Sequence, residues 1–472
     1  MRTRVGYRPA RLCMLALSTA SVPCGVARAD ANDATPAAPG PDSRWPALVG
    51  AQFTSIVQNQ SSLRAPYSGP FSLKPDGDTQ PSETIGFYFG WAPVSWGQLY
   101  LDLEKFNGAG VSNATGLAGL TNGDVIREGA NNLPKRFYVA RRYLRLMWPL
   151  GSQTIDVQSS QDEVGGREAT TRLELKVGTL GVNDDFDKNR YAGAARTQFL
   201  NWSLWQDTAW DFAADTRGYT QGFVVAFVSE LWSLRYGAYL MPLFANGQSL
   251  EESASRARGS NLELTLAPPA TGTVLRLLAF ENTARMGVYA EALASAAATH
   301  TIADIVADDR EGRHKYGFGL NVEQALADGG ETGVFGRLGW NDGKTEDFAF
   351  TEVDRHLSVG GQVSGVHWRR AADRLGIAWV REGLSPEHRA YLAAGGSGFL
   401  LGDGRLNYAH ERIAEAYYRL EFAWPFPAVP NWIPHQQPRL QIGPDFQYVS
   451  NPGYNADRGP VHVWGVRAHL EY

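Results

Sequence analysis

Arginine and acidic side chains recur at alternate positions of several short segments, where they could bind a polar solute. Guanidinium groups offer forked donors and carboxylates offer acceptors, a combination that suits the hydroxyl groups of a sugar. The same charges would also keep the wall of a water-filled pore wetted and act as an electrostatic filter, and the sequence leaves both roles open. The candidates are Arg235, Arg337, Arg419, Arg467, Arg145, Asp102 and Glu104.

A second group of candidates lies in the segment from Val182 to Arg217, which is rich in large aromatic residues. Such side chains are poorly accommodated in water, so we expect this segment to pack into the interior of the protein. The rings could stack on the apolar faces of sugars or simply anchor the segment, and the sequence does not decide between the two. The pathway candidates here are Phe186, Asp187, Trp202 and Trp205, with Phe199, Trp210 and Phe212 beside them.

No arrangement typical of catalysis or metal binding emerges. The nine histidines are scattered, and no HExxH, GxSxG or P-loop string occurs. The run from Asn183 to Asp187 carries hard oxygen ligands that could bind calcium. It lacks the EF-hand spacing and its final glutamate, which favours a solvated external loop instead. We therefore expect no catalytic residue, no metal, no cofactor and no enzyme activity.

The candidate residues are positioned by segments with a period of two, which is typical of strands whose faces meet different surroundings. Apolar residues alternate with polar ones or glycine in each of these segments. Clear examples are Ile85 to Trp91, Leu99 to Leu103, Tyr316 to Val322 and Trp464 to Tyr472. Alternation predicts an all-β protein.

Sixteen strands are predicted, joined by connections that are alternately short and long, as in outer-membrane barrels. An even number returns both chain ends to the periplasm. The connection of residues 149–170 breaks the pattern and is read as an insertion, although residues 154–158 could form an extra strand. The strands are expected near 47–58, 83–91, 97–106, 137–148, 171–181, 218–228, 231–241, 259–267, 272–281, 313–325, 331–341, 354–368, 373–382, 412–423, 438–450 and 460–472.

The fold expected is a transmembrane antiparallel β-barrel of about 16 strands with a loop folded into the lumen. Lipid offers no hydrogen-bond partner, so strands that cross it must close into a barrel. The exception to an apolar outer face is Arg142, which the alternation places outward beside Tyr138. Either the fourth strand bulges there, or it begins later and Arg142 lies at the membrane interface.

The N-terminus has the features of an export signal over residues 1–29. Four arginines precede the apolar run Leu12 to Val22, and Ala27-Arg28-Ala29 offers a cleavage site. Residues 30–46 are rich in Ala, Pro and Asp and are expected to be a flexible lead-in. Residues 47–472 then form a single barrel. Both cysteines, Cys13 and Cys24, would leave with the signal peptide.

Composition excludes several classes of protein. The chain has 472 residues with 20% charged, 11% aromatic and 51 glycines, values unlike those of a disordered or coiled-coil chain. No apolar stretch beyond the N-terminus is long enough for a membrane-spanning helix. After removal of residues 1–29, 39 Lys and Arg face 49 Asp and Glu, a net charge of −10 that argues against nucleic acid as a partner.

The C-terminal strand ends in an aromatic residue, Tyr472, with apolar residues at every second position before it. This pattern resembles the signal by which outer-membrane barrels are recognised for assembly, although phenylalanine is the commoner last residue. It implies the barrel-assembly machinery and outer-membrane lipid as partners, and an outer-membrane location in a Gram-negative bacterium. Monomer and homo-oligomer both stay open.

A family resemblance is carried by residues 176–187, 197–202, 213–219, 235–237, 339–343, 402–408, 444–448, 451–455 and 458–460. On these segments the chain, from about residue 171 onward, resembles the bacterial carbohydrate-selective porins of OprB type. The resemblance implies a sixteen-stranded outer-membrane barrel for small sugars such as glucose, narrowed by an inserted loop and charged walls. General diffusion without sugar preference, a barrel enzyme and a soluble periplasmic β-protein are the alternatives.

Overall fold

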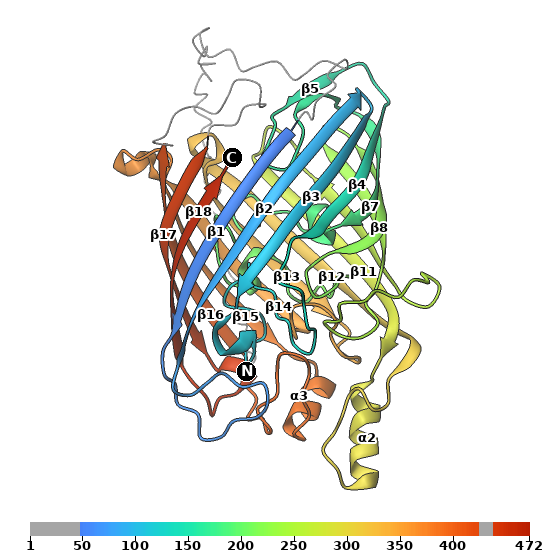
Figure 1. Cartoon of the computed structure of the whole chain (residues 1–472), viewed down its shortest axis with the longest axis vertical. Coiled ribbons are helices and arrows are strands. Elements are labelled where there is room, and N and C mark those ends of the chain that lie inside the picture. Colours follow the sequence, from blue (N-terminus) through green and yellow to red (C-terminus); the bar gives the residue numbers. More distant parts are fainter. Residues whose placement is uncertain (1–47, 424–437) are drawn as a thin grey trace, which may run out of the picture. The chain divides into compact units, whose positions relative to one another are not determined.

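The computed structural model describes residues 48–423 and 438–472, and over these ranges sixteen antiparallel strands form one closed barrel (Figure 1). The predicted signal peptide and lead-in lie outside the described residues. The barrel strands are β1 Leu48–Gln60, β2 Asp78–Val94, β3 Gly97–Gly108, β4 Tyr138–Pro149, β7 Arg172–Leu180, β8 Thr220–Val228, β9 Trp232–Leu240, β10 Arg258–Leu266, β11 Thr273–Met286, β12 Arg310–Ala327, β13 Thr332–Asn341, β14 Arg355–Ser364, β15 Arg374–Gly383, β16 Glu411–Ala423, β17 Arg439–Ser450 and β18 Val461–Glu471.

Closure is made by the first and last strands. Strand β1 pairs antiparallel with β18, with Phe53 opposite Leu470 and Val57 opposite Val466. Every barrel strand therefore has a neighbour on both edges. This arrangement satisfies the backbone hydrogen bonds that lipid cannot accept, and the predicted barrel is confirmed.

The helices are short and lie in the connections. They are α1 Trp202–Trp205, α2 Tyr289–Thr299 and α3 Pro386–Ala393, with 3₁₀ segments η1 Val111–Ala114, η2 Val182–Asp184, η3 Asp328–Gly330, η4 Gly365–Trp368 and η5 Pro452–Tyr454. No helix among the described residues is both long enough and apolar enough to cross a bilayer. The last four residues of the strand expected over 354–368 belong to η4, which the Ser364 side chain caps.

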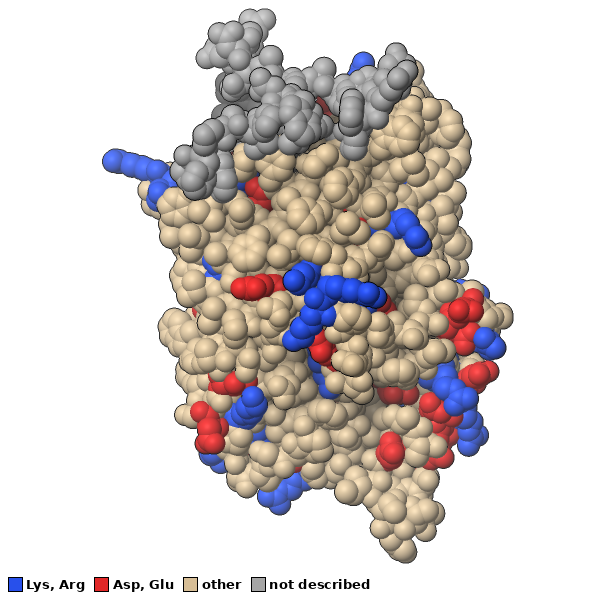
Figure 2. All heavy atoms as spheres, in the orientation of Figure 1, with Lys and Arg blue, Asp and Glu red and all other residues tan. Residues whose placement is uncertain are grey.

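The two faces of the strands differ as the alternation predicts. Leu101, Leu234, Leu338 and Trp464 are exposed on the outside, whereas their neighbours along each strand are less exposed and face the lumen. In Figure 2, tan atoms cover much of the visible barrel wall, and charged side chains gather at mid-height and toward the lower end. The outer band thus meets the acyl chains and the lumen holds the polar groups.

Val359 tests the assignment of the outer face, because it lies in the middle of β14 and is 47% exposed. We expect Val359→Arg to lower the free energy of unfolding by about 2–4 kcal/mol, the cost of a basic residue facing lipid near the midplane. Urea unfolding in lipid vesicles, followed by tryptophan fluorescence, measures the change. Val366→Arg is the control, since Val366 is also 47% exposed but lies in the connection after β14. Equal losses in both variants would contradict the assignment.

The two ends of the barrel differ in their connections. At the end where β1 begins and β18 ends, most connections hold only a few residues, whereas α2 and α3 lie in long loops at the opposite end (Figure 1). In outer-membrane barrels the end with short turns faces the periplasm. Among the connections that the structure describes at this end, the longest is that of residues 150–171, where β5 Thr154–Val157 and β6 Gly166–Ala169 pair with each other and not with the barrel. This connection is therefore an insertion and not a seventeenth barrel strand.

A bulge in β4 explains the position of Arg142. Asp102 pairs with Arg141 and Leu103 with Val139, so Ala140 is skipped in the register between β3 and β4. The extra residue rotates the start of the strand. Arg142 stays exposed on the outside, whereas Tyr138, expected to face outward, lines the lumen. Of the two explanations for Arg142, a bulge in the fourth strand or a later start of that strand, the bulge is therefore correct.

Candidate solute pathway in the barrel lumen

The connection between β7 and β8, residues 181–219, folds into the barrel, and we call it the lumen loop. It contains η2 and α1. Its six large aromatic residues named above are all at most 9% exposed. The prediction that this segment packs into the lumen is confirmed.

Arg337 of β13 fixes the lumen loop from the opposite wall. Its fully buried guanidinium lies 3.1 Å from the carboxylate of Asp187 and donates to the backbone carbonyls of Ala192, Leu204 and Trp205. A planar group with five donors can bind several loop segments at once. One strand side chain thereby binds three separate parts of the lumen loop.

Three further lumen-facing residues hold the middle of the loop. Arg467 donates to the carbonyls of residues 195 and 198, at 2.6 and 2.7 Å, and Arg419 donates to the carbonyl of residue 197 at 3.3 Å. Glu415 accepts the backbone N–H groups of residues 200 and 201. The hydrogen bonds of all three to the loop are made to its main chain, so they fix its course.

The acidic run at the start of the loop is paired with cations of the barrel wall. Asp185 lies 2.7 Å from Lys176, and Asp184 lies 3.1 Å from Arg141. With Asp187 on Arg337, three carboxylates in four positions each have a basic partner. The run is therefore not the solvated external loop expected from sequence. The chain turns into the lumen directly after β7. Cations of the barrel wall then offset the free-energy cost of burying the acidic side chains.

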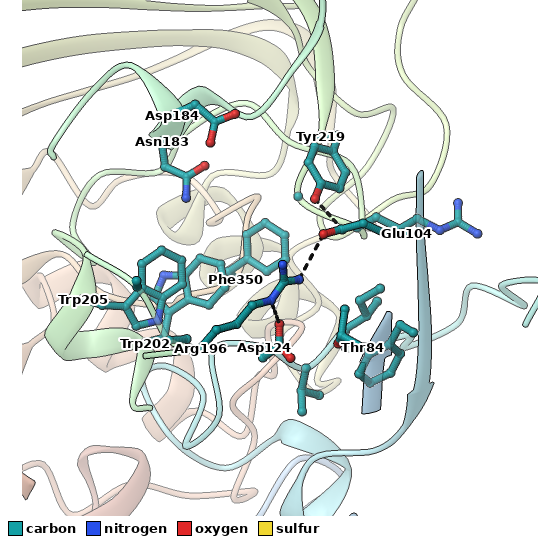
Figure 3. A pocket seen from close by; sticks show the side chains of 18 of the residues that line it. Thr84, Glu104, Asp124, Asn183, Asp184, Arg196, Trp202, Trp205, Tyr219 and Phe350 are labelled. Atoms are coloured by element: carbon teal, nitrogen blue, oxygen red, sulfur yellow. Dashed lines mark hydrogen bonds and ion pairs between the residues drawn. The ribbon is translucent and has the colours of Figure 1, made fainter. Parts of the chain in front are cut away.

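A cavity of about 330 Å³ lies between the lumen loop and the wall formed by β2, β3 and β4 (Figure 3). Strand residues Thr84, Glu104 and Tyr138 contribute to it, and Trp202 and Arg196 contribute from the loop. Charged groups and aromatic rings face each other across this space. Its volume is large enough for a small solute of at most a few rings.

Arg196 is at the centre of the charged side of the cavity. Its guanidinium donates to Glu104 at 3.1 Å, to Asp124 at 2.7 Å and to the hydroxyl of Tyr88 at 3.0 Å. The side chain is still 27% exposed, so a solute can reach it. Burial lowers the pKa of Arg196, but Asp124, Tyr88 and Glu104 raise it well above its ordinary value, and the group stays charged.

Tyr219, at the end of the lumen loop, completes this network by donating to Glu104 at 2.6 Å. Burial and the neighbouring carboxylate of Glu104 raise the pKa of the Tyr219 hydroxyl well above its ordinary value. The hydroxyl therefore stays protonated at neutral pH. Glu104 thus accepts from two donors of the same loop and keeps both in fixed positions.

The other side of the cavity is aromatic. Trp202 stacks on Phe350 with ring centroids 4.5 Å apart and an interplanar angle of 13°, and Trp205 lies against Trp202. Phe212 also stacks on Phe350, with ring centroids 5.8 Å apart. All four residues line the cavity. Flat apolar rings opposite hydrogen-bonding groups match the two kinds of surface that a sugar ring presents.

The sequence-predicted candidates occupy different places in this arrangement. Glu104, Trp202 and Trp205 line the cavity. Asp102 and Arg145 are absent from its lining; Asp102 binds Arg141 at 2.6 Å, and Arg145 binds Glu168 and Glu174. Arg235 donates to Ser233 on its own strand. The remaining candidates, Arg337, Arg419, Arg467, Phe186 and Asp187, hold or fill the lumen loop and are absent from the cavity lining.

The cavity also contains residues that sequence reasoning missed. Arg196 and Asp124 lie in connections where no period of two applies, and Phe350 belongs to the connection between β13 and β14. Tyr219 falls within the strand expected near 218–228, but β8 begins one residue after it. Arg196 carried one usable signal, since it is a basic residue within the aromatic segment. Nothing in the sequence indicated that residue 350 would meet residue 202.

Among the described residues, Asp347, Asp354 and His388 place one ligand atom each within 4.8 Å of one another. The ammonium of Lys315 already pairs with Asp347 and lies 3.5 Å from Asp211. A basic residue of the protein therefore balances this acidic group, which does not contribute to the cavity lining.

A closed barrel whose lumen is narrowed by an inward loop around a charged and aromatic cavity defines an outer-membrane porin. A family model described as carbohydrate-selective porin, OprB family, matches residues 96–472. The chain therefore belongs to the OprB family of carbohydrate-selective porins and is located in the outer membrane of a Gram-negative bacterium.

Among the solved structures compared, OprB of Pseudomonas putida supports the fold. OprB of Pseudomonas putida is 15% identical with a TM-score of 0.65, and the match covers 90% of this chain and 94% of that one. The outer-membrane channel DcaP of Acinetobacter baumannii (9% identity, TM-score 0.44) and an anion-selective porin from Comamonas acidovorans (8% identity, TM-score 0.43) each match over 90% of this chain and 98% of their own. A search of curated protein sequences found no significant match.

Proposed function

We propose that small sugars such as glucose diffuse passively through this barrel and bind weakly in the cavity between the lumen loop and strands β2 to β4. The observation that carries the proposal is the opposition of Arg196 and Glu104 to the Trp202–Phe350 stack. Hydroxyl groups would exchange hydrogen bonds with the charged pair while the ring face lies on the aromatic side. Weak binding that releases quickly raises flux at low concentration.

Planar-bilayer conductance tests this proposal. We expect glucose to reduce the ion current through the wild-type channel in a saturable way, because a bound sugar obstructs the same cavity that ions cross. Mannitol of similar mass is the control for viscosity and volume. If the current falls equally with both solutes, the channel is a general diffusion porin without sugar preference.

The proposed transport needs no catalytic step, no cofactor and no energy source. Arg196 pairs with Glu104 and Asp124, Arg141 pairs with Asp162 and Asp184, and no histidine is found among the described residues that line the cavity. This arrangement supports a channel over an outer-membrane enzyme. An enzyme barrel with a filled core would admit no solute in liposome swelling, whereas the channel proposed here admits glucose.

Export and assembly are part of the same proposal. Residues 1–29 would be removed near Ala29, residues 30–46 would form a flexible lead-in, and the barrel-assembly machinery would bind the final strand that ends in Tyr472. The apolar outer band would then contact outer-membrane lipid. N-terminal sequencing of the protein purified from outer membranes checks the cleavage site, and sedimentation in detergent determines whether it is monomeric or oligomeric.

A further inference from the structure

The insertion between β4 and β7 is unusual because it is a long connection at the periplasmic end of the barrel. Strands β5 and β6 form a separate two-stranded hairpin, with Val157 opposite Gly166 as the last pair. Residues 158–165 connect these two positions, and we call them the hairpin tip. Figure 1 shows β5 at the end of the barrel opposite α2 and α3.

The hairpin tip folds back against the inner wall of the barrel. Val164 is only 3% exposed and packs with Leu48 and Tyr100. Its backbone N–H donates to the Tyr100 hydroxyl at 3.1 Å, and the Gln161 side chain donates to the carbonyl of Ala51 at 3.1 Å. The tip is therefore bound to β1 and β3 by both apolar and polar contacts.

Two glycines of the wall make room for the tip. A Cβ atom on Gly50 would lie 2.2 Å from the carbonyl oxygen of Gln161, and one on Gly90 would lie 2.4 Å from Cγ2 of Val164. Both glycines occupy buried, lumen-facing positions of β1 and β2. The tip and this part of the wall are complementary in shape, and larger residues at these positions would displace the tip.

The base of the hairpin is held by ion pairs. Glu168 of β6 lies 2.6 Å from Arg145 of β4 and 2.9 Å from Arg172 at the start of β7. All three side chains are nearly buried, with exposures of 5 to 11%. Buried pairs of this kind fix orientation because separating them leaves an unpaired charge.

Asp162 connects the tip to the cavity. Its carboxylate lies 2.9 Å from the guanidinium of Arg141, which also binds Asp102 of the wall and Asp184 of the lumen loop. Asp162 is 37% exposed and lines the cavity together with the exposed Lys188. Burial raises the pKa of Asp162, but Arg141 and Lys188 lower it below its ordinary value, so the group is ionised.

We propose that the hairpin tip forms the periplasmic boundary of the sugar cavity and sets the largest solute that can leave the pore, with Asp162 as the tip residue that contacts the solute. The pore is then narrowed from both ends, by the lumen loop on the external side and by the hairpin tip on the periplasmic side. This inference rests on the proposed function, because it assigns a role within the same cavity.

The test is to replace residues 158–165 by Asn-Gly, a two-residue turn that suits the paired positions 157 and 166. We expect single-channel conductance to rise roughly twofold. In liposome swelling, the ratio of raffinose to glucose entry should also rise. A second variant with the hairpin intact, Asp162→Asn, should lower the preference for cations over anions. Asp156→Asn is its control, since Asp156 is on the same hairpin but 78% exposed and outside the cavity.

The outcomes separate this inference from the proposed function. The role of the tip would be overturned by two results together. The shortened variant would have the conductance and the raffinose-to-glucose ratio of the wild type, and Asp162→Asn and Asp156→Asn would have equal ion selectivity. In that case glucose would still block the wild-type channel, and the proposed function would be unaffected. Absence of glucose block with a rise in conductance on shortening would instead overturn sugar binding and leave the tip as a boundary of the pore. If the shortened hairpin prevents assembly, the pair of asparagine variants decides.

Discussion

Replacement of Arg337 by alanine is expected to open the channel. The side chain makes five contacts with the lumen loop through one guanidinium, and its removal leaves the buried carboxylate of Asp187 without a cation. Breaking a buried ion pair typically costs about 3–5 kcal/mol, more than a loop of this length can recover by small shifts. The loop should detach from β13 while the strand pairing of the barrel persists.

The measurement is single-channel conductance in planar bilayers, with roughly a twofold or larger increase and loss of glucose block expected as the lumen widens. Arg235→Ala is the matched control, because Arg235 is also a lumen-facing strand arginine but contacts Ser233 and not the loop. Arg337→Lys should resemble alanine more than wild type, since one ammonium cannot replace a planar fork of five donors. Unchanged conductance in Arg337→Ala would show that other contacts suffice to hold the loop.

Replacement of Arg196 by alanine should weaken sugar binding without opening the pore. Arg196 is on the surface of the cavity and bridges Glu104 and Asp124, so its removal takes away a charged donor that a solute can reach. A hydrogen bond to a charged group contributes about 1.5–3 kcal/mol. The dissociation constant for glucose should therefore rise about tenfold or more.

Glucose titration of the current measures this change. Arg190→Ala is the control on the same loop, because Arg190 is 48% exposed, pairs with Glu331 and does not line the cavity. Arg196→Lys should bind glucose with intermediate strength, since it keeps the charge but cannot reach both acids in a fixed geometry. If Arg196→Ala and Arg190→Ala bind glucose equally, the charged side of the cavity does not contact the sugar.

The barrel could be predicted from sequence because lipid and water impose the same alternation on every strand. Leu101 and Leu338 show the outer face directly, and their lumen-facing neighbours show the inner one. The bulge at Ala140 could not be located in this way, because one extra residue shifts the register without changing the composition of the strand. Tyr138 was consequently assigned to the wrong face.

The cavity was only partly predictable, because alternation gives the face of a residue but not what fills the lumen beside it. Arg337 and Arg467 face inward as expected, yet the lumen loop covers them and their donors bind its carbonyls. Arg196 lies in a loop whose course depends on those contacts. Residues brought together by an irregular loop carry no periodic signal, which is why the main donor of the cavity was missed.

The way in which the strand arginines hold the lumen loop has a consequence for how new sugar preferences could arise. Arg467 and Arg419, and most donors of Arg337, bind backbone carbonyls of the loop, which every amino acid provides. Side chains that face the cavity, such as Arg196, can therefore be exchanged while the loop keeps its course. The frame of the pore and its selectivity are specified by different sets of residues, so one barrel can be adapted to another solute by a few substitutions in a single loop.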